Sequence, residues 1–333
     1  VTMIGAEANS FLFRNENKYV VATWPKSTRI LLGDLSLSVR DGEFHTSRRK
    51  LLYEAFQPRA LSSYIPTMEK ITNEYLNKWE KQEQLTWYPE IRNYTFDIAS
   101  NLFMSKDGGS KTHLGKLFET WCQGLFTIAN PFPWTSFQKA LRARKAMLKE
   151  LEKIIIQRQE SDNLEEDALG LLIRAKDEAG NSLTLEELKD QILLLLFAGH
   201  ETLTSAIASF CLLTARHPDV MEKLREEQTR LSLTSPLSLE DIKQMTYLEQ
   251  VIKEVMRIIP PVGGGFRKAI KSFEFNGYQI PEGWTLQYQI AQTHKDDTIY
   301  TESDRFDPDR LSPARAEDKK TTFAYVPFGG GLR

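Results

Sequence analysis

Apolar residues recur at intervals of three and four along most of the chain, which is the spacing of a helix with one buried face. This pattern predicts helices within residues 61–104, 136–159 and 184–216. A further clear helix begins at Thr246 and ends at Pro260-Pro261, because proline cannot continue a helix. Most of the chain is therefore expected to be helical.

Two of these helix starts carry the signature of a capping box. Thr184 is followed three residues later by Glu187, and Thr246 is followed at the same distance by Glu249. In such a box each side chain bonds to a backbone N–H group that the first helical turn leaves unpaired. We therefore expect both threonines to cap their helices.

The spacing of apolar residues changes after Pro261. Phe273 and Phe275 alternate with polar residues, and Asn276-Gly277 has the composition of a tight hairpin turn. Residues 278–280 and 286–290 are predicted to be further strands. The sequence contains no alternating strand–helix series with a glycine-rich first turn, so a dinucleotide-binding fold is not expected. The fold class predicted is mainly α with a small β region.

Composition narrows the classes of function. The 333 residues include 43 Lys+Arg and 45 Asp+Glu, and the net charge of −2 argues against nucleic acid as the main partner. Only Cys122 and Cys211 are present, which excludes a disulfide framework and favours a reducing compartment. No apolar run reaches the roughly 18 residues of a spanning helix, and the longest, residues 192–199, is expected to be a buried helix. We expect a cytoplasmic protein, with an anchor before Val1 left open.

Polar residues interrupt the apolar core of the third helix at Ala198-Gly199-His200-Glu201-Thr202. In one interpretation the helix leaves the core here, and His200 and Glu201 face solvent. In the other, Gly199 lets another group approach the helix axis, and Thr202 turns its hydroxyl to the carbonyl of Ala198. The acid and the alcohol would then line a groove that holds a diatomic ligand and relays protons.

Two familiar motifs are excluded because the sequence lacks residues that they require. A zinc-protease motif would need a second histidine where Thr204 stands. The glycine runs 263–265 and 329–331 are not followed by Lys-Ser/Thr, so neither is a phosphate-binding loop.

Charged residues at helical spacing form two further candidate sites. Glu254 and Arg257 lie three apart, and Arg310 in a later Asp-Pro-Asp-Arg segment could reach the same glutamate. The alternative is a solvated surface pair, worth only a few tenths of a kcal/mol. His45 and Arg49 lie four apart, which on a helix makes them a pair of donors for a carboxylate, with a solvated charged face as the alternative.

The order of these patterns resembles the cytochrome P450 family over essentially the whole chain. Residues 198–202 resemble the oxygen-activation segment of that family's long central helix. Glu254 and Arg257, together with Arg310, are similar to its Glu-Arg-Arg triad. Residues 328–333, Phe-Gly-Gly-Gly-Leu-Arg, resemble the opening of its haem-binding loop.

Other segments add to this resemblance. His45 and Arg49 resemble the haem-propionate motif on an early helix of the family. Residues 260–267 and 275–284 are similar to the retinoid-hydroxylating branch, and most like its cyanobacterial members. The resemblance implies a cytochrome P450 fold, present here in part as a single domain over residues 1–333 and truncated at both ends.

The activity implied by the resemblance is that of a haem-dependent monooxygenase. Such an enzyme inserts one oxygen atom of O₂ into a hydrophobic substrate, here expected to be a retinoid or another isoprenoid. The cofactor would be haem b, and the electrons would come from NAD(P)H through a ferredoxin or reductase partner. No nucleic acid partner is expected.

The resemblance also implies roles for individual residues. Glu201 and Thr202 would be catalytic and would deliver protons during oxygen activation, whereas Glu254, Arg257 and Arg310 would form a structural network that supports the haem loop. The residues expected to bind haem are His45, Arg49, Ala198, Gly199, Arg267, Phe328, Gly331 and Arg333. The residues expected to border the substrate are Trp24, Ala198, Val262 and Gly263.

One departure from the family concerns the haem ligand. The family's loop places a cysteine two positions after the arginine, whereas the sequence stops at Arg333. Cys122 and Cys211 lie in helical segments without that context, so the axial cysteine is expected just past Arg333. We therefore interpret the chain as an internal fragment that is inactive as it stands.

Two other functions stay open. A family member can rearrange peroxides or dehydrate its substrate without O₂, although the intact Glu201-Thr202 pair argues against this. A haem-less binding module is the other alternative, should the missing end be absent in the cell.

Overall fold

A computed structural model describes residues 1–161 and 165–332. Within it the chain forms two compact units. The first, called unit 1, comprises Val1–Trp24, Ser205–Leu233 and the chain from Glu240 onward. The second, called unit 2, comprises Pro25–Thr204 and Thr234–Leu239. The expectation of one partial domain stays a prediction.

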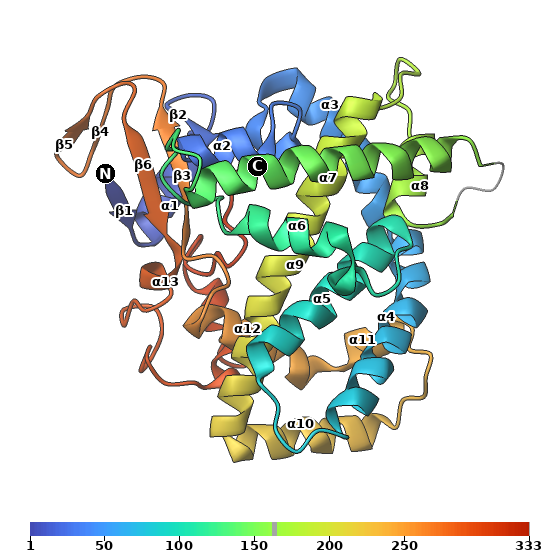
Figure 1. The fold of residues 1–333 in the computed structure, drawn as a ribbon. Helices are drawn as coiled ribbons and strands as arrows, with labels where there is room; N and C mark the ends of the chain where they lie inside the picture. The colour runs from blue at the N-terminus through green and yellow to red at the C-terminus, as the bar shows by residue number, and fades with distance from the viewer. Residues whose placement is uncertain (162–164, 333) are drawn as a thin grey trace. The chain divides into compact units, whose positions relative to one another are not determined.

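Unit 2 is built of helices. Two of them, α4 and α5, pack together through Ile71, Tyr75 and Ile98, and α6 lies along α7 (Figure 1). The helices of this unit are α2 (Lys26–Leu32), η1 (Leu37–Val39), α3 (Gly42–Tyr53), η2 (Glu54–Phe56), α4 (Pro58–Trp79), α5 (Trp87–Met104), η3 (Gly109–Lys111), α6 (His113–Cys122), α7 (Ser136–Gln159), α8 (Ala168–Arg174) and the first part of α9 (Leu185–Arg216).

Among the described residues, unit 1 contains the strands and the remaining helices, although the first residue of α11 is assigned to unit 2. Its elements are β1 (Thr2–Ile4), α1 (Ala6–Arg14), β2 (Val20–Thr23), α10 (Pro218–Leu231), α11 (Leu239–Gln244), α12 (Thr246–Ile258), β3 (Gly264–Ala269), β4 (Phe273–Phe275), β5 (Tyr278–Ile280), β6 (Thr285–Gln289), α13 (Ile290–Thr293), η4 (Pro308–Leu311) and η5 (Glu317–Lys319). The mainly α fold with a small β region is therefore confirmed.

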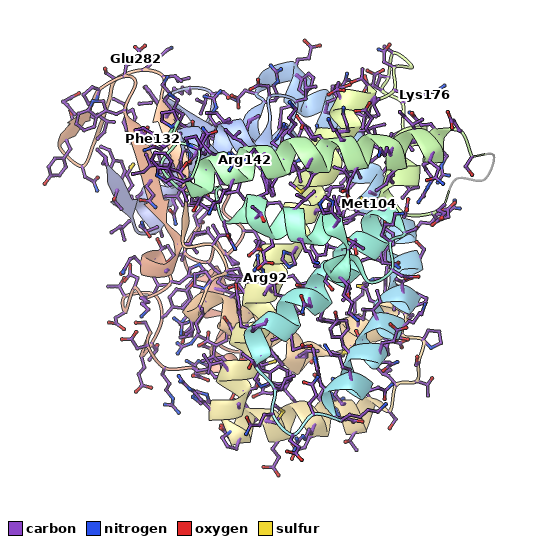
Figure 2. The ribbon with its side chains drawn as sticks, viewed as in Figure 1. Arg92, Met104, Phe132, Arg142, Lys176 and Glu282 are labelled. Atoms are coloured by element: carbon purple, nitrogen blue, oxygen red, sulfur yellow. The ribbon has the colours of Figure 1, made fainter. Side chains whose placement is uncertain are left out.

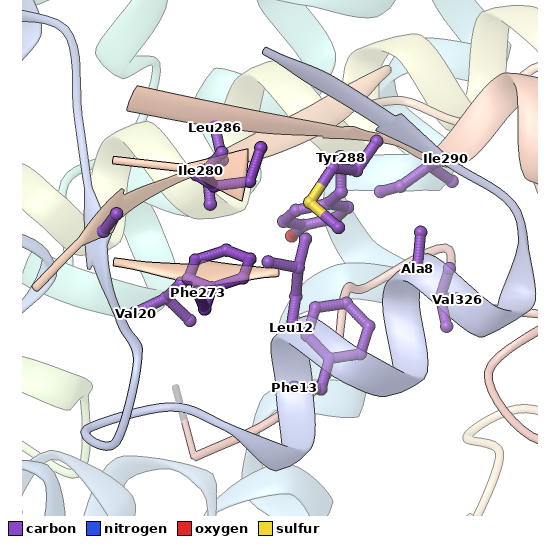
Figure 3. Packing of buried hydrophobic residues seen from close by; sticks show 12 residues of the cluster. Ala8, Leu12, Phe13, Val20, Phe273, Ile280, Leu286, Tyr288, Ile290 and Val326 are labelled. Atoms are coloured by element: carbon purple, nitrogen blue, oxygen red, sulfur yellow. The ribbon is translucent and has the colours of Figure 1, made fainter. Parts of the chain in front are cut away.

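The larger sheet has the strand order β1-β6-β3-β2, in which β1 is parallel to β6 and the other neighbours are antiparallel. Helix α1 covers this sheet with Leu12 and Phe13, which pack with Leu286 and Tyr288 of β6 in one buried cluster (Figure 3). Arg267 lies on β3, between Ala22 of β2 and Leu286 of β6. The sheet therefore holds this arginine in a strand with neighbours on both sides.

Strands β4 and β5 form the separate hairpin that the sequence predicts. Asn276 and Gly277, at its turn, have φ of 49° and 79°. A two-residue turn of this kind needs positive φ at both positions, and asparagine and glycine adopt it most readily. The predicted hairpin is confirmed for the physical reason that suggested it.

The long helix α9 begins as its sequence predicts. The backbone N–H of Glu187 donates to the Thr184 hydroxyl at 3.2 Å, and the backbone N–H of Thr184 donates to the Glu187 carboxylate at 2.8 Å. The helix ends at Arg216, and Pro218 opens α10. Among the described residues α9 is long and apolar enough to cross a membrane, a test that the core helix of a soluble protein also passes.

The second predicted capping box is wrong. Thr246 is the first residue of α12, and Glu249 pairs with Lys253 one turn later. The buried carboxylate of Glu227, on α10, instead accepts hydrogen bonds from the backbone N–H groups of Tyr247 at 2.6 Å and Leu248 at 2.9 Å. A carboxylate from a neighbouring helix has taken the role that local spacing assigned to Glu249.

The capping role of Glu227 can be tested by unfolding experiments. Glu227→Ala leaves two backbone donors of α12 without an acceptor, and we expect it to lower the free energy of unfolding by about 1–2 kcal/mol. Glu249→Ala is the matched control, because it removes only a surface pair, worth less than about 0.5 kcal/mol. Urea denaturation followed by circular dichroism measures both. A larger loss of unfolding free energy for Glu249→Ala than for Glu227→Ala would show that Glu249 caps the helix after all, as the sequence predicts.

Candidate functional site

The polar segment of α9 has the local geometry that the sequence suggests. The Thr202 hydroxyl donates to the Ala198 carbonyl oxygen at 2.7 Å, as expected. Gly199 does admit a close neighbour, since a Cβ at this position would lie 3.1 Å from the ring of Phe103 on α5. Ala198 is exposed, and Thr202 is half-buried.

His200 and Glu201 do not simply face solvent. The His200 side chain is 2% exposed, and its Nε2 lies 2.9 Å from the carbonyl oxygen of Arg92 on α5. The Arg92 guanidinium (Figure 2) donates to the Glu201 carboxylate at 3.2 Å, and Nδ1 of His200 lies 3.3 Å from the same oxygen. Arg92 also pairs with Glu119 of α6 at 2.9 Å.

These neighbours determine the ionisation of Glu201. Burial disfavours the charged carboxylate, but the hydrogen bond and charge of His200, together with Arg92, outweigh burial and hold the pKa of Glu201 below its usual value. Sequence reasoning assigned no role to Arg92 or His200. A helical arginine about a hundred residues away carries no local signal of such a contact.

The position where a zinc-protease motif would need a second histidine has a partner of its own. Thr204, where the motif would need histidine, is buried, and its hydroxyl lies 2.6 Å from the hydroxyl of Thr95 on α5. No group of three His, Cys, Asp or Glu side chains able to hold a metal ion occurs among the described residues. Cys122 and Cys211 are both free thiols.

The structure brings Glu254, Arg257 and Arg310 together in the interior of unit 1. All three side chains are 0% exposed. Glu254 accepts two bonds from Arg257, at 2.8 and 2.9 Å, and one from Nε of Arg310 at 3.0 Å. The alternative of a solvated surface pair is wrong for these residues.

A second carboxylate, which sequence reasoning missed, completes this cluster. Glu317 accepts from Arg310 at 2.9 Å and from Arg315 at 2.9 Å. The remaining donors of the two buried arginines go to backbone carbonyl groups, those of His294, Thr301, Glu302 and Arg305. The cluster therefore holds an irregular part of the chain through its main-chain oxygens.

Arg267 is buried on β3 and only partly satisfied. Its guanidinium carbon lies 5.6 and 5.2 Å from the ring centres of Phe13 and Tyr288. One nitrogen lies 2.6 Å from the carboxylate of Glu16, another residue that sequence reasoning missed. Its Nε is buried and has no hydrogen-bond partner among the described residues. Glu16 also accepts from the backbone N–H of Leu332 at 2.6 Å.

The other predicted site residues are distributed over both units. In unit 2, His45 and Arg49 lie one turn apart on α3, as predicted, with His45 half-buried and Arg49 exposed. In unit 1, Phe328 is 87% exposed. Gly331 has φ of +94°, and a Cβ there would lie 2.6 Å from the Glu16 carboxylate. Arg333 lies outside the described residues.

The residues predicted to border the substrate also come from both units. Trp24 follows β2 and is half-buried. Val262 and Gly263 are exposed in the turn between α12 and β3, where the Gly263 carbonyl accepts from the Ile290 N–H at 2.8 Å. Ala198 is on α9, as described above.

Comparison with known proteins decides the family. The family model for cytochrome P450 matches residues 1–333. The chain belongs to the cytochrome P450 family. The resemblance inferred from the ordered motifs is thereby confirmed.

The relatives of this P450 include bacterial and animal enzymes. It is 52% identical over 329 residues to cytochrome P450 120 of Synechocystis sp., covering 99% of the chain and 74% of that protein. It is 35% identical over 351 residues to cytochrome P450 26B1 of Homo sapiens, covering 100% of the chain and 68% of that protein. A solved structure described as retinoic-acid-bound cyanobacterial CYP120A1 matches with a TM-score of 0.96 and 52% identity, covering 100% of the chain and 76% of its own.

Membership implies the cofactor and the class of reaction. Cytochromes P450 bind haem b, receive electrons from NAD(P)H through a redox partner, and act as monooxygenases on hydrophobic molecules, and so does this P450. The buried, unsatisfied Nε of Arg267 fits this cofactor, because a planar guanidinium with a free donor suits a haem propionate.

The buried triad can be tested with a charge-conserving substitution. In the protein carrying the family's C-terminal cysteine segment, we expect Arg257→Lys to prevent stable haem incorporation and to lower the free energy of unfolding by about 3 kcal/mol or more. A lysine cannot bind two carboxylate oxygens and two carbonyl groups at once.

Arg305→Lys is the matched control, because Arg305 makes an exposed pair with Glu302 in the same unit. We expect it to leave haem content unchanged. Haem content is measured from the absorbance per protein and stability from urea unfolding. Normal haem occupancy in Arg257→Lys would show that the triad does not support haem binding.

Proposed function

We propose that this P450 hydroxylates a retinoid or a closely related isoprenoid acid. The observation that carries the proposal is 52% identity over the whole chain to a cyanobacterial P450 whose structure is described as retinoic-acid-bound. The animal P450 26B1 relatives and the matching segments 260–267 and 275–284 give independent support. The substrate class is therefore proposed from similarity to these relatives, and the chemistry is proposed from the polar residues of α9.

Four of the predicted residues are proposed to hold the cofactor through its carboxylates. His45, Arg49, Arg267 and Arg333 would neutralise the haem propionates, since each arginine offers a planar fork suited to a carboxylate. Ala198 and Gly199 on α9 would contact the haem, and Phe328 and Gly331 would belong to the loop that carries the cysteine ligand. The thiolate ligand would come from that loop, just past Arg333.

Haem with a thiolate ligand supplies O–O bond cleavage and oxygen transfer to a C–H bond. The chain's own task is proton delivery. The Thr202 hydroxyl, which now donates to Ala198, can rotate to donate into the reaction site instead, and it keeps its lone pairs to accept a proton from a neighbour. Glu201, the next residue on α9, would bring protons from solvent to this hydroxyl.

The remaining proposed contacts concern the substrate and the electron donor. Ala198, Val262 and Gly263 would border the hydrophobic substrate, with Trp24 as a further contact. The three small or apolar residues carry no group that would require a polar partner, which suits a hydrocarbon chain. The electron donor would be a ferredoxin or a reductase.

The role of Thr202 can be measured as coupling. In the holoenzyme we expect Thr202→Ala to fold and bind haem, but to release several-fold more hydrogen peroxide per electron consumed, because the proton donor is lost. Thr202→Ser, which keeps the hydroxyl, is the matched control and should retain most of the coupling. Equal coupling in wild type and Thr202→Ala would mean that the hydroxyl only caps the turn at Ala198.

The substrate class has a separate test. We expect the holoenzyme to show the red-shifted ferrous–CO absorption of a thiolate-ligated haem and to convert retinoic acid to a product heavier by one oxygen atom. Palmitic acid, which carries the same carboxylate without the isoprenoid chain, is the comparison substrate and should react many-fold more slowly. Mass spectrometry of the products under ¹⁸O₂ checks both. Equal turnover of the two acids would remove retinoids as the preferred class.

A further inference from the structure

The two ring nitrogens of His200 have different partners. Nε2 lies 2.9 Å from the carbonyl oxygen of Arg92, which can only accept a hydrogen bond, so Nε2 must carry a hydrogen. Nδ1 lies 3.3 Å from a carboxylate oxygen of Glu201. If the ring were neutral and the carboxylate ionised, two lone pairs would face each other across this contact. One proton between Nδ1 and Oε1 makes the contact attractive.

The surroundings favour keeping that proton in place. His200 is 2% exposed and packs edge-on against Phe96 and Phe118, with ring centres 5.3 and 5.5 Å away. In such surroundings an unpaired lone pair or an isolated charge is costly, whereas a proton shared by an imidazole and a carboxyl group is not.

Other titratable groups face the same carboxylate. Arg92 contributes a second contact to Glu201 from α5, and its own second partner is Glu119 of α6. The Cys122 thiol, also on α6, lies by Glu201, and burial raises its pKa well above the usual value, so it stays protonated. Arg92 thus orients the pair twice, through its carbonyl oxygen to His200 and through its guanidinium to Glu201.

A cleft of about 200 Å³ reaches His200 from outside. It lies among α5, α6 and α9, and its walls include Tyr88, Arg92, Ser110, Glu119 and His200. The Glu119 side chain is 55% exposed at its rim. Water molecules in the cleft would have polar partners along the length of the cleft, and the innermost of them would lie at the imidazole ring.

We propose that His200 is the proton store for Glu201, with Arg92 as the positioning residue. This proposal rests on the proposed function, because it explains how Glu201 is supplied. The N–H bond at Nδ1 of His200 breaks, the proton moves to Oε1 of Glu201, and the protonated carboxyl group then passes it on towards Thr202. Nδ1 regains a proton from bulk solvent through water in the cleft, so the pair returns to its starting state with one proton transferred inward.

The location of the proton can be observed without turnover. We expect ¹⁵N NMR of the histidine-labelled holoenzyme in its diamagnetic ferrous–CO state to show Nδ1 of His200 protonated or strongly hydrogen-bonded at pH 7. Glu201→Gln removes the negative partner and should change the chemical shift of this nitrogen towards that of a ring nitrogen without a carboxylate partner. Arg92→Met removes the competing positive charge and should strengthen the Nδ1–Oε1 contact, which shifts the resonance in the opposite direction. A free Nδ1 lone pair that does not respond to Glu201→Gln would overturn the proposal.

Coupling provides the second measurement. We expect His200→Gln, which keeps a donor for the Arg92 carbonyl but holds no labile proton, to increase peroxide release per electron several-fold and to change the solvent isotope effect. His113→Gln is the matched control, because it makes the same substitution at an exposed His–Glu contact on α6. The proposal would be refuted if His200→Gln showed the coupling and the isotope effect of the wild type. If that variant does not fold, the absence of the NMR changes expected for Glu201→Gln and Arg92→Met would refute it.

The outcomes separate this inference from the proposed function. Loss of retinoid turnover in the wild type would overturn the function, while the ¹⁵N spectrum of His200 in the holoenzyme would still report on the proton pair. Normal turnover with an unchanged His200→Gln variant would overturn the proton store alone.

Discussion

The buried charge cluster around Glu254 is the interaction on which the C-terminal part of unit 1 depends. Arg257 and Arg310 have no access to solvent, so each of their donors must meet an acceptor inside the protein or leave a costly unpaired group. Glu254 and Glu317 balance the two positive charges. The donors that remain bind carbonyl groups of the segment after α13, which consists of turns and the short helices η4 and η5.

Polar contacts connect this cluster to the segment that is proposed to form the haem loop. His294, whose carbonyl oxygen accepts from Arg257, also accepts the backbone N–H of Val326 at its Nε2. Burial lowers the pKa of His294 to about 4, which keeps this nitrogen neutral and able to accept. Three residues further on, the chain enters the glycine run 329–331, and directly after this run Glu16 connects Leu332 to Arg267. A chain of polar contacts thus extends from the triad to the last described residues.

The polar side chains of helix α9 have partners of a different kind. The hydroxyls of Thr202 and Thr204 return to carbonyl groups of their own helix, at Ala198 and His200, so they add no unsatisfied group. Glu201 is different, because its partners come from α5 and from its neighbour His200. A carboxylate whose arginine and imidazole partners line a cleft is suited to exchanging protons, whereas the fully enclosed Glu254 is suited to holding structure.

Much of this protein is determined by patterns that lie close together in the sequence. Helical spacing, the Thr184–Glu187 box, the prolines and the Asn276-Gly277 turn act over a few residues, and the structure confirms the elements that they predict. The order of the motifs was enough to identify the family. Tertiary structure alone decided which distant group satisfies each buried charge: Glu227 in place of Glu249 at α12, Glu317 beside Arg310, Glu16 beside Arg267 and Arg92 beside Glu201. A buried charge requires a partner, but local sequence does not specify which partner the fold will bring to it.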